Sequence, residues 1–220
     1  TVYSSIDRWG RYAYGNQPAI AQWNLVGLAN ALLPLIAEKP ERAIALAEEL
    51  LGTFPERFES FYRAGLQRKL GLSDTQEGDD ALAQNLLARM AENRADFTLT
   101  FRGLSEIVGA SEANDGVVRR LFEDPAAFDE WAATWRDRLE REARSPEECR
   151  SDMRSVNPAF IPRNHRVEEA INAAVTGNDF EPFEELLAVL ASPFDDQGSR
   201  ERYAAPPRPE EVVQQTFCGT

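Results

Sequence analysis

The chain has 220 residues, which is enough for one domain of ordinary size with a substantial core. Hydrophobic residues make up 43% of it, and this share excludes bulk disorder. Its 37 acidic and 24 basic residues give a formal net charge of −13, so the summed field repels nucleic-acid phosphates and anionic lipid surfaces. We therefore expect neither nucleic acid nor a membrane among its partners.

Targeting signals and cysteine content bear on where the protein is located. We find no run of about 18 apolar residues and no basic region followed by an apolar stretch, so we predict neither a membrane span nor a signal peptide. The two cysteines, Cys149 and Cys218, are too few for a disulfide framework. A reducing, cytoplasmic location is the expectation.

The first half of the chain has the apolar spacing of helices. From Pro18 onward apolar residues recur every three or four positions. Such stripes lie within residues 25–36, 44–51, 54–66 and 82–90. Gly52 and Gly71 follow the second and third stripes and predict where those helices end.

The second half has clearer helix start signals. Asp124-Pro125 places a capping acceptor before a proline that suits the first helical position. Ser145 with Glu148 three residues later predicts a capping box. Apolar stripes then run through 167–175, stopped by Gly177, and through 183–190. No repeat with a fixed period is present, and the predicted fold class is all-α.

The C-terminal segment differs in composition from the helical part. After Pro193 it becomes rich in Pro, Asp, Gln and Arg, and Ala204 to Pro209 favour polyproline conformation. We predict a helical region over 1–191 and an extended, Pro-rich arm over 192–220 that ends in Cys218.

Three sequence blocks together resemble one known family. They are Gly-Arg-Tyr-Ala-Tyr-Gly-Asn-Gln-Pro at 10–18, Asn-Pro-Ala-Phe-Ile-Pro-Arg-Asn-His-Arg at 157–166, and Thr-Phe-Cys-Gly-Thr at 216–220. In this order they resemble the C-terminal part of selenoprotein O (SelO), a pseudokinase-like protein adenylyltransferase. The resemblance implies the helical C-terminal lobe of a protein-kinase-like fold, with family-specific helices and an extended tail after it.

The resemblance also implies an activity for the full-length protein. Members of the family transfer AMP from ATP, with Mg²⁺, to Ser, Thr or Tyr hydroxyls of protein substrates. In the family the nucleotide-binding elements precede the block at 10–18, so this chain is expected to lack the ATP- and metal-binding residues. We expect no catalytic residue and no metal site here, no cofactor bound to this fragment, and ATP reached only through the missing N-terminal part. Alone, the fragment is expected to be inactive.

Residues 1–17 correspond by this resemblance to the end of an activation-segment-like loop. Arg11, Tyr14, Asn16 and Gln17 are then the candidates for facing nucleotide or protein substrate. The alternative is that Asn16 and Gln17 cap the helix that begins at Pro18, while the tyrosines pack on the lobe.

Two further residues invite a chemical interpretation. Asp7-Arg8-Trp9-Gly10 has one residue more than the Asp-Phe-Gly metal turn of kinases, so we expect Asp7 to be a loop residue paired with a nearby arginine. His165 is the only histidine, which excludes a multi-histidine zinc site. Its reference pKa of about 6.5 suits a general base, but capping and packing at a helix start explain it as well.

Cys218 is the redox candidate. Family members carry selenocysteine or cysteine at this place, and in bacterial members the terminal cysteine can pair with one in the activation segment. Residues 1–17 contain no cysteine, and Cys149, the other cysteine of the chain, falls in a predicted helix. The redox role is therefore left open. Two other functions compete with AMP transfer: a helical scaffold that binds proteins through its acidic faces and Pro-rich arm, and a thiol sensor that uses Cys218.

Overall fold

The computed structural model describes residues 4–216. Within this range the structure is helical and contains no strand, which confirms the all-α prediction. By its internal contacts the chain forms two compact units, one made of residues up to Arg63 together with those from Val213 onward, and one of Ala64–Val212. The predicted division at residues 191 and 192 stays a prediction.

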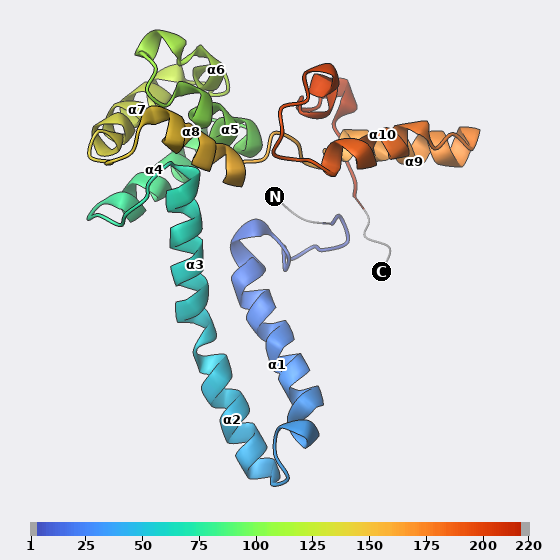
Figure 1. The fold of residues 1–220 in the computed structure, drawn as a ribbon. Helices are drawn as coiled ribbons and strands as arrows, with labels where there is room; N and C mark the ends of the chain where they lie inside the picture. Colours follow the sequence, from blue (N-terminus) through green and yellow to red (C-terminus); the bar gives the residue numbers. More distant parts are fainter. Residues whose placement is uncertain (1–3, 217–220) are drawn as a thin grey trace. The chain divides into compact units, whose positions relative to one another are not determined.

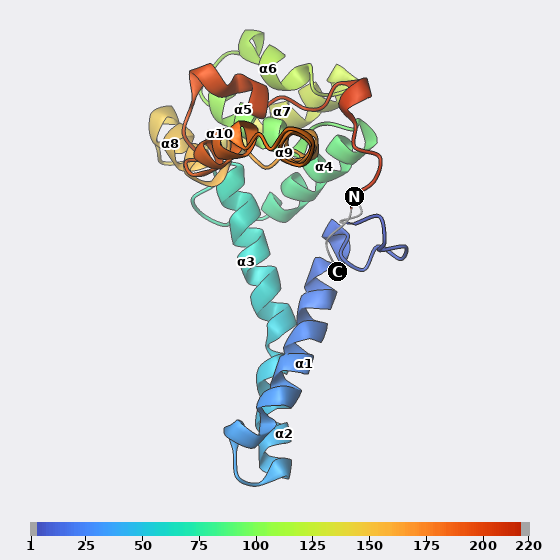
Figure 2. The same cartoon turned by 90° about the vertical axis from the view of Figure 1, so that its right-hand side faces the viewer.

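The first unit is built on a helical hairpin. The chain enters it through a short 3-10 turn, η1, and then forms α1 and α2, which pack against each other in opposite directions (Figures 1 and 2). The bounds are η1 (Tyr14–Asn16), α1 (Gln17–Ile36), α2 (Pro40–Gly52) and α3 (Phe54–Lys69), and the boundary between the units falls within α3. Gly52 ends α2, as the sequence predicts.

Helix α1 is a candidate membrane-spanning segment by length and composition alone, which the count of apolar residues in the sequence does not single out. Tyr14–Ile36 is long and apolar enough to cross a membrane, with a mean hydropathy of 1.4 over its most apolar window. Residues 12–37 carry no charged side chain, although asparagine, glutamine and proline interrupt the apolar run and conceal it from a simple count. A core helix of a soluble protein has the same length and composition, so this property alone does not make α1 a membrane helix.

The second unit holds the remaining helices. Its α-helices are α4 (Asp79–Glu92), α5 (Phe97–Ile107), α6 (Gly116–Arg119), α7 (Pro125–Leu139), α8 (Pro146–Val156), α9 (Asn164–Gly177) and α10 (Glu181–Leu190). Its 3-10 turns are η2 (Glu112–Asn114), η3 (Gly198–Tyr203) and η4 (Pro209–Glu211).

The predicted helix signals of the second half are confirmed by hydrogen bonds. Asp124 accepts from the Ala126 N–H at 3.0 Å and so caps α7. Ser145 and Glu148 form the reciprocal capping box of α8. Helix α9 ends at Gly177, and Asn178 adopts the left-handed conformation that closes it.

Two stacked tryptophans form the centre of the core in the second unit. Trp131 and Trp135 lie on α7 with ring centroids 5.6 Å apart, and both are almost fully buried. The indole N–H of Trp131 donates to the Leu82 carbonyl, and that of Trp135 to the Leu70 carbonyl, each at 2.9 Å. The two residues thus fill the core and satisfy backbone acceptors that burial would otherwise leave without partners.

The block that begins at Asn157 has a structural role. The Asn157 side chain is fully buried, donates to the Lys69 carbonyl at 2.9 Å and accepts from the Lys69 ammonium at 3.1 Å. Arg102 donates to the backbone carbonyls of Asn157 and Phe194, both at 3.1 Å. Burial lowers the pKa of Lys69. These bonds join four segments that lie far apart in the sequence.

The C-terminal arm is packed over part of its length. Tyr203, at the end of η3, is buried with Phe160, Leu186 and Val189 in a small apolar cluster beside α9 and α10. Arg163 donates to the Ala204 carbonyl at 3.0 Å and pairs with Asp96. The arm therefore follows the second unit at least as far as Tyr203, because these contacts hold it there.

Replacing Trp135 tests the role of the stacked pair. Trp135→Phe leaves the buried Leu70 carbonyl without its donor and opens space in the core, so we expect it to lower the free energy of unfolding by about 2–4 kcal/mol in urea titrations. Trp9→Phe is the matched control, because Trp9 is 92% exposed, and should change little. Equal effects of the two substitutions would contradict this view of the core.

Candidate functional site

The loop before α1 is organised around one carboxylate. Asp7 accepts hydrogen bonds from the backbone N–H of Tyr12 at 2.9 Å and of Arg11 at 2.8 Å. These bonds, that from Tyr12 first, lower the pKa of Asp7. Gly10 sits between them with φ of +64°, a conformation that glycine adopts easily. Asp7 is a loop residue, as expected, but it bonds to the backbone of Arg11 and not to its guanidinium.

The side chain of Arg11 is left available by this arrangement. Its guanidinium lies over the ring of Trp23 on α1, 5.6 Å from the centroid, and the residue is exposed. It makes no ion pair with any residue between 4 and 216. An exposed arginine stacked on an aromatic ring keeps its N–H donors for an anion.

The other predicted site residues lie on the same turn. Tyr14 opens η1, and burial together with a hydrogen bond to Tyr62 raises its pKa to about 12. The amide of Asn16 donates to the Gly10 carbonyl at 2.8 Å. Gln17 is the first residue of α1 and is exposed. The structure therefore gathers all four candidates around the entry to α1.

The capping interpretation of Asn16 is corrected by these contacts. Asn16 occupies the N-cap position of α1, but its side chain makes no capping hydrogen bond. The backbone of Asn16 is helical, whereas most N-cap residues have an extended backbone. Its side-chain amide therefore donates to the Gly10 carbonyl within the loop and not to the first turn of α1.

The end of the C-terminal arm meets the same loop. Ser5 N–H donates to the Thr216 carbonyl at 2.7 Å, and Thr216 N–H donates to the Ser5 hydroxyl at 2.9 Å. The hydroxyl of the buried Ser4 also donates to the Thr216 carbonyl, at 3.2 Å, and this is the third bond of the set. We call this set of bonds the serine clasp. Cys218, the redox candidate, lies outside the described residues.

Cys149 is placed where its thiol is hard to ionise. It lies on α8 as predicted, is buried, and contacts the Gly71 carbonyl at 3.4 Å. Burial raises the pKa of the thiol. A thiol in this setting reacts slowly, because the thiolate is the nucleophile.

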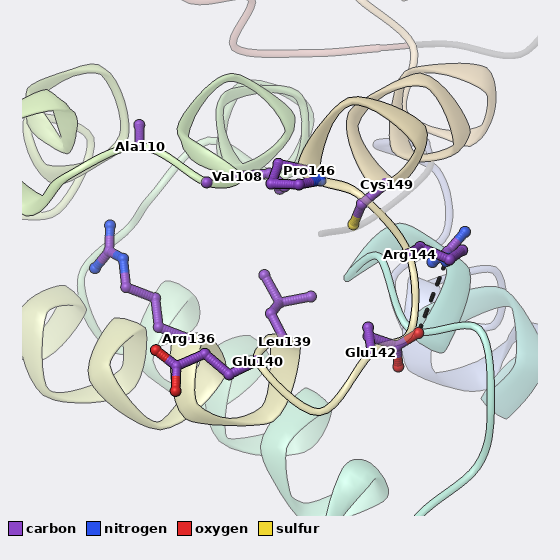
Figure 3. A pocket seen from close by; sticks show the side chains of 10 residues that line it. Val108, Ala110, Arg136, Leu139, Glu140, Glu142, Arg144, Pro146 and Cys149 are labelled. Carbon is purple, nitrogen blue, oxygen red and sulfur yellow. Dashed lines mark ion pairs between the residues drawn. The ribbon is translucent and has the colours of Figure 1, made fainter.

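A cavity of about 380 Å³ lies beside Cys149 and was not predicted (Figure 3). Leu139 of α7 and Cys149 of α8 point toward one another across it. The arginines at its edge are already neutralised, because Arg136 pairs with Asp115 and Arg144 with Glu142 and Asp152. No sequence motif marks this cavity, since its walls come from separate helices.

His165 is buried at the start of α9. Its Nε2 has no hydrogen-bond partner in the part of the chain that the structure describes. Burial, followed by the charge of Arg166, lowers its pKa. The ring is therefore neutral at neutral pH, as a packed histidine is. Among residues 4–216 no group of three or more His, Cys, Asp or Glu side chains could hold a metal ion.

Comparison with known proteins defines the class. The family described as "Protein adenylyltransferase SelO" matches residues 2–191. A curated protein nucleotidyltransferase YdiU of Bradyrhizobium sp. (strain ORS 278) is 57% identical over 219 residues, and those of Bradyrhizobium diazoefficiens and Rhodopseudomonas palustris (strain BisB18) are 55% and 56% identical. Each match covers 100% of this chain and 44% of the relative.

These matches place the chain in a family of nucleotidyltransferases. The chain belongs to the SelO family, which confirms the resemblance seen in the three sequence blocks. It spans less than half the length of the curated relatives that it matches.

Removing the carboxylate of Asp7 tests the organisation of the loop. Asp7→Ala deletes both acceptor bonds, so we expect trypsin to cleave after Arg8 and Arg11 severalfold faster at pH 8, measured by mass spectrometry. Because the pKa of Asp7 is lowered in the folded protein, the stabilisation of the loop by its carboxylate is present above about pH 4. This stabilisation is lost as the pH falls through the folded pKa. Glu38→Ala, between α1 and α2, is the control. Unchanged cleavage in Asp7→Ala would mean that the carboxylate does not hold the loop.

Proposed function

We propose that the full-length protein is a protein adenylyltransferase that transfers AMP from ATP to Ser, Thr or Tyr hydroxyls of other proteins. The family description and the name of the relatives, protein nucleotidyltransferase, support a nucleotide-transferring enzyme. This chain's part in the proposal rests on the loop at 7–17. Its exposed Arg11, at the entry to α1, makes no ion pair with a described residue.

The chemistry of AMP transfer gives such an arginine a purpose. The hydroxyl oxygen of the protein substrate attacks the α-phosphorus of ATP. The bond between that phosphorus and the oxygen that bridges the α- and β-phosphates breaks, and pyrophosphate leaves. The hydroxyl proton passes to a base or to water. Negative charge on the phosphates must be offset, although this chain has a net charge of −13. Arg11 is a cation that makes no ion pair among residues 4–216 and is therefore our candidate for that role.

We infer that the magnesium centre is not held by this chain. Mg²⁺ takes oxygen ligands from carboxylates and phosphates, and the described residues hold no suitable group of acidic side chains. The carboxylates of Asp74, Asp79 and Glu142 converge on Arg138, which neutralises them in part. We therefore assign no step to a metal here. We expect ATP and Mg²⁺ to be held by parts of the full-length protein outside this chain, in the cytoplasm, and this chain alone to be inactive.

Thiol control is a second candidate function, favoured by the serine clasp. Thr216 is bonded to Ser4 and Ser5, and Cys218 follows two residues later in the sequence. A peroxide could oxidise that thiol to a sulfenic acid, with water as the second product. Cys149 is a poor disulfide partner because it is buried and its pKa is raised. Any such control would therefore act through the oxidised thiol itself or through a thiol outside this chain.

Nucleotide binding and self-modification test the proposed activity. With ATP and Mg²⁺, the full-length protein should bind ATP and attach AMP to itself, seen as a mass increase, whereas this chain alone should do neither. A full-length protein that binds no ATP and modifies neither itself nor added proteins would contradict the assignment.

Arg11 can be tested separately from the activity as a whole. Arg11→Ala in the full-length protein should lower the rate of AMP transfer about tenfold or more, and Arg11→Lys should restore part of it. A rise in KM for ATP would place Arg11 on the nucleotide, and a rise in KM for the protein substrate alone would place it on that substrate. Arg42→Ala, an exposed arginine on α2, is the control. An active enzyme that tolerates Arg11→Ala would remove Arg11 from the site while leaving the activity intact.

A further inference from the structure

Helices α9 and α10 form a hairpin with several apolar side chains exposed to water. The two helices pack against each other within the second unit (Figures 1 and 2). Val175, in the last turn of α9, is 79% exposed, and Leu187 on α10 is 60% exposed. Three more apolar side chains of the hairpin are about half exposed: Ile171, Phe180 and Phe183. We call these five side chains the hairpin patch.

The core of the hairpin is built from other side chains. Leu186 and Val189 of α10 are buried in the apolar cluster that contains Tyr203. Phe183 and Leu187 are one helical turn apart, so they lie on one face of α10, and both have more than half of their surface in water. Apolar clusters that a folded unit leaves exposed in this way mark interaction sites.

The hairpin is also acidic. Residues 167–199 contain eight acidic residues and no Lys, Arg or His. Arginines outside this stretch pair with only some of them. Three exposed carboxylates around the start of α10 form no ion pair with a residue between 4 and 216: Asp179, Glu181 and Glu184.

The position of these acids at the start of α10 does not account for all of their charge. A helix N-terminus carries about half of one positive charge, which favours acidic residues in the first turn. Asp179, Glu181 and Glu184 carry three negative charges, so most of their charge is left without compensation. The hairpin therefore combines an exposed apolar cluster with an excess of negative charge at the same turn.

We propose that the hairpin patch binds a basic amphipathic helix of a partner protein. The apolar residues of such a helix recur every three or four positions and would cover the patch. Its lysines and arginines would meet the uncompensated carboxylates, and opposite charges would speed association. This inference does not depend on AMP transfer, so it can be tested without an activity assay.

The charge of the hairpin disfavours two other covers. A second copy of this chain would bring the same acidic groups to the interface, where like charges repel one another. An anionic lipid surface is repelled for the same reason. The rest of the full-length protein is a third possible cover, and the experiment below distinguishes it, because a patch that is already covered cannot bind an added helix.

A synthetic helix is the probe for the test. A fluorescent peptide of about 18 residues forms five helical turns, and Leu and Lys can be arranged on its opposite faces. It should bind the full-length protein and raise the fluorescence anisotropy, and added salt should weaken this binding. The same peptide with Glu in place of every Lys should not bind.

Leu187 offers a matched pair of substitutions. Leu187→Ala in the full-length protein should weaken binding of the Leu–Lys peptide about tenfold, because the variant removes apolar contact area from the patch. Leu50→Ala on α2 is the control, since Leu50 is 67% exposed and lies in the first unit. It should leave the affinity unchanged.

The carboxylates provide a second test that stands if Leu187→Ala fails to fold. The double variant Glu181→Gln, Glu184→Gln should weaken binding severalfold and reduce its dependence on salt. Its control is Glu48→Gln, Glu49→Gln, a neighbouring pair of exposed carboxylates on α2.

Several results would overturn the proposal. If the full-length protein does not bind the Leu–Lys peptide, the patch is covered by the protein itself. Binding that Leu187→Ala and the double variant at 181 and 184 leave unchanged would be general attraction of a basic peptide to an acidic protein. A dimer that Leu187→Ala dissociates would make a second copy the cover, and vesicle binding that Leu187→Ala abolishes would make it lipid.

Discussion

The first unit depends on α1, a helix without a charged side chain and without a buried residue. Its apolar faces support the loop that leads into it, since Arg11 stacks on Trp23 and η1 continues directly into the helix. The position of the four candidate site residues is therefore tied to α1. Because the loop and the helix share contacts, whatever restrains α1 also restrains the loop.

The second unit is stabilised differently. Its core is closed by Trp131 and Trp135, and buried polar contacts around Asn157 and Arg102 join helices to the C-terminal segment. Such groups are costly to bury unless they are bonded, and the side chains of Asn157 and Arg102 both are. The block at 157–166 is therefore explained by folding. The loop at 7–17, by contrast, has the exposed guanidinium of Arg11.

Local signals made the helices predictable, whereas tertiary contacts did not follow from them. Asp124, Ser145 and Gly177 mark helix ends by local hydrogen bonding and backbone preference, and the structure has them there. The apolar length of α1 is not evident from a run of apolar residues, because Asn24, Asn30 and Pro34 interrupt it. The bonds of Thr216 to Ser4 and Ser5, and the cavity beside Cys149, bring together residues far apart in the chain. No pattern along the sequence encodes that proximity. The family resemblance pointed to Arg11, but not to its stacking on Trp23.

We propose that the loop at 7–17 lies close to the bound nucleotide in the full-length protein. Hydrogen–deuterium exchange of the full-length protein, with and without a non-hydrolysable ATP analogue and Mg²⁺, tests this directly. We predict slower exchange of the amides of residues 8–16 when nucleotide is bound. The exchange of the amides of α7, a core helix of the second unit, should not change. Unchanged exchange across the loop under conditions where the nucleotide is shown to bind would contradict it.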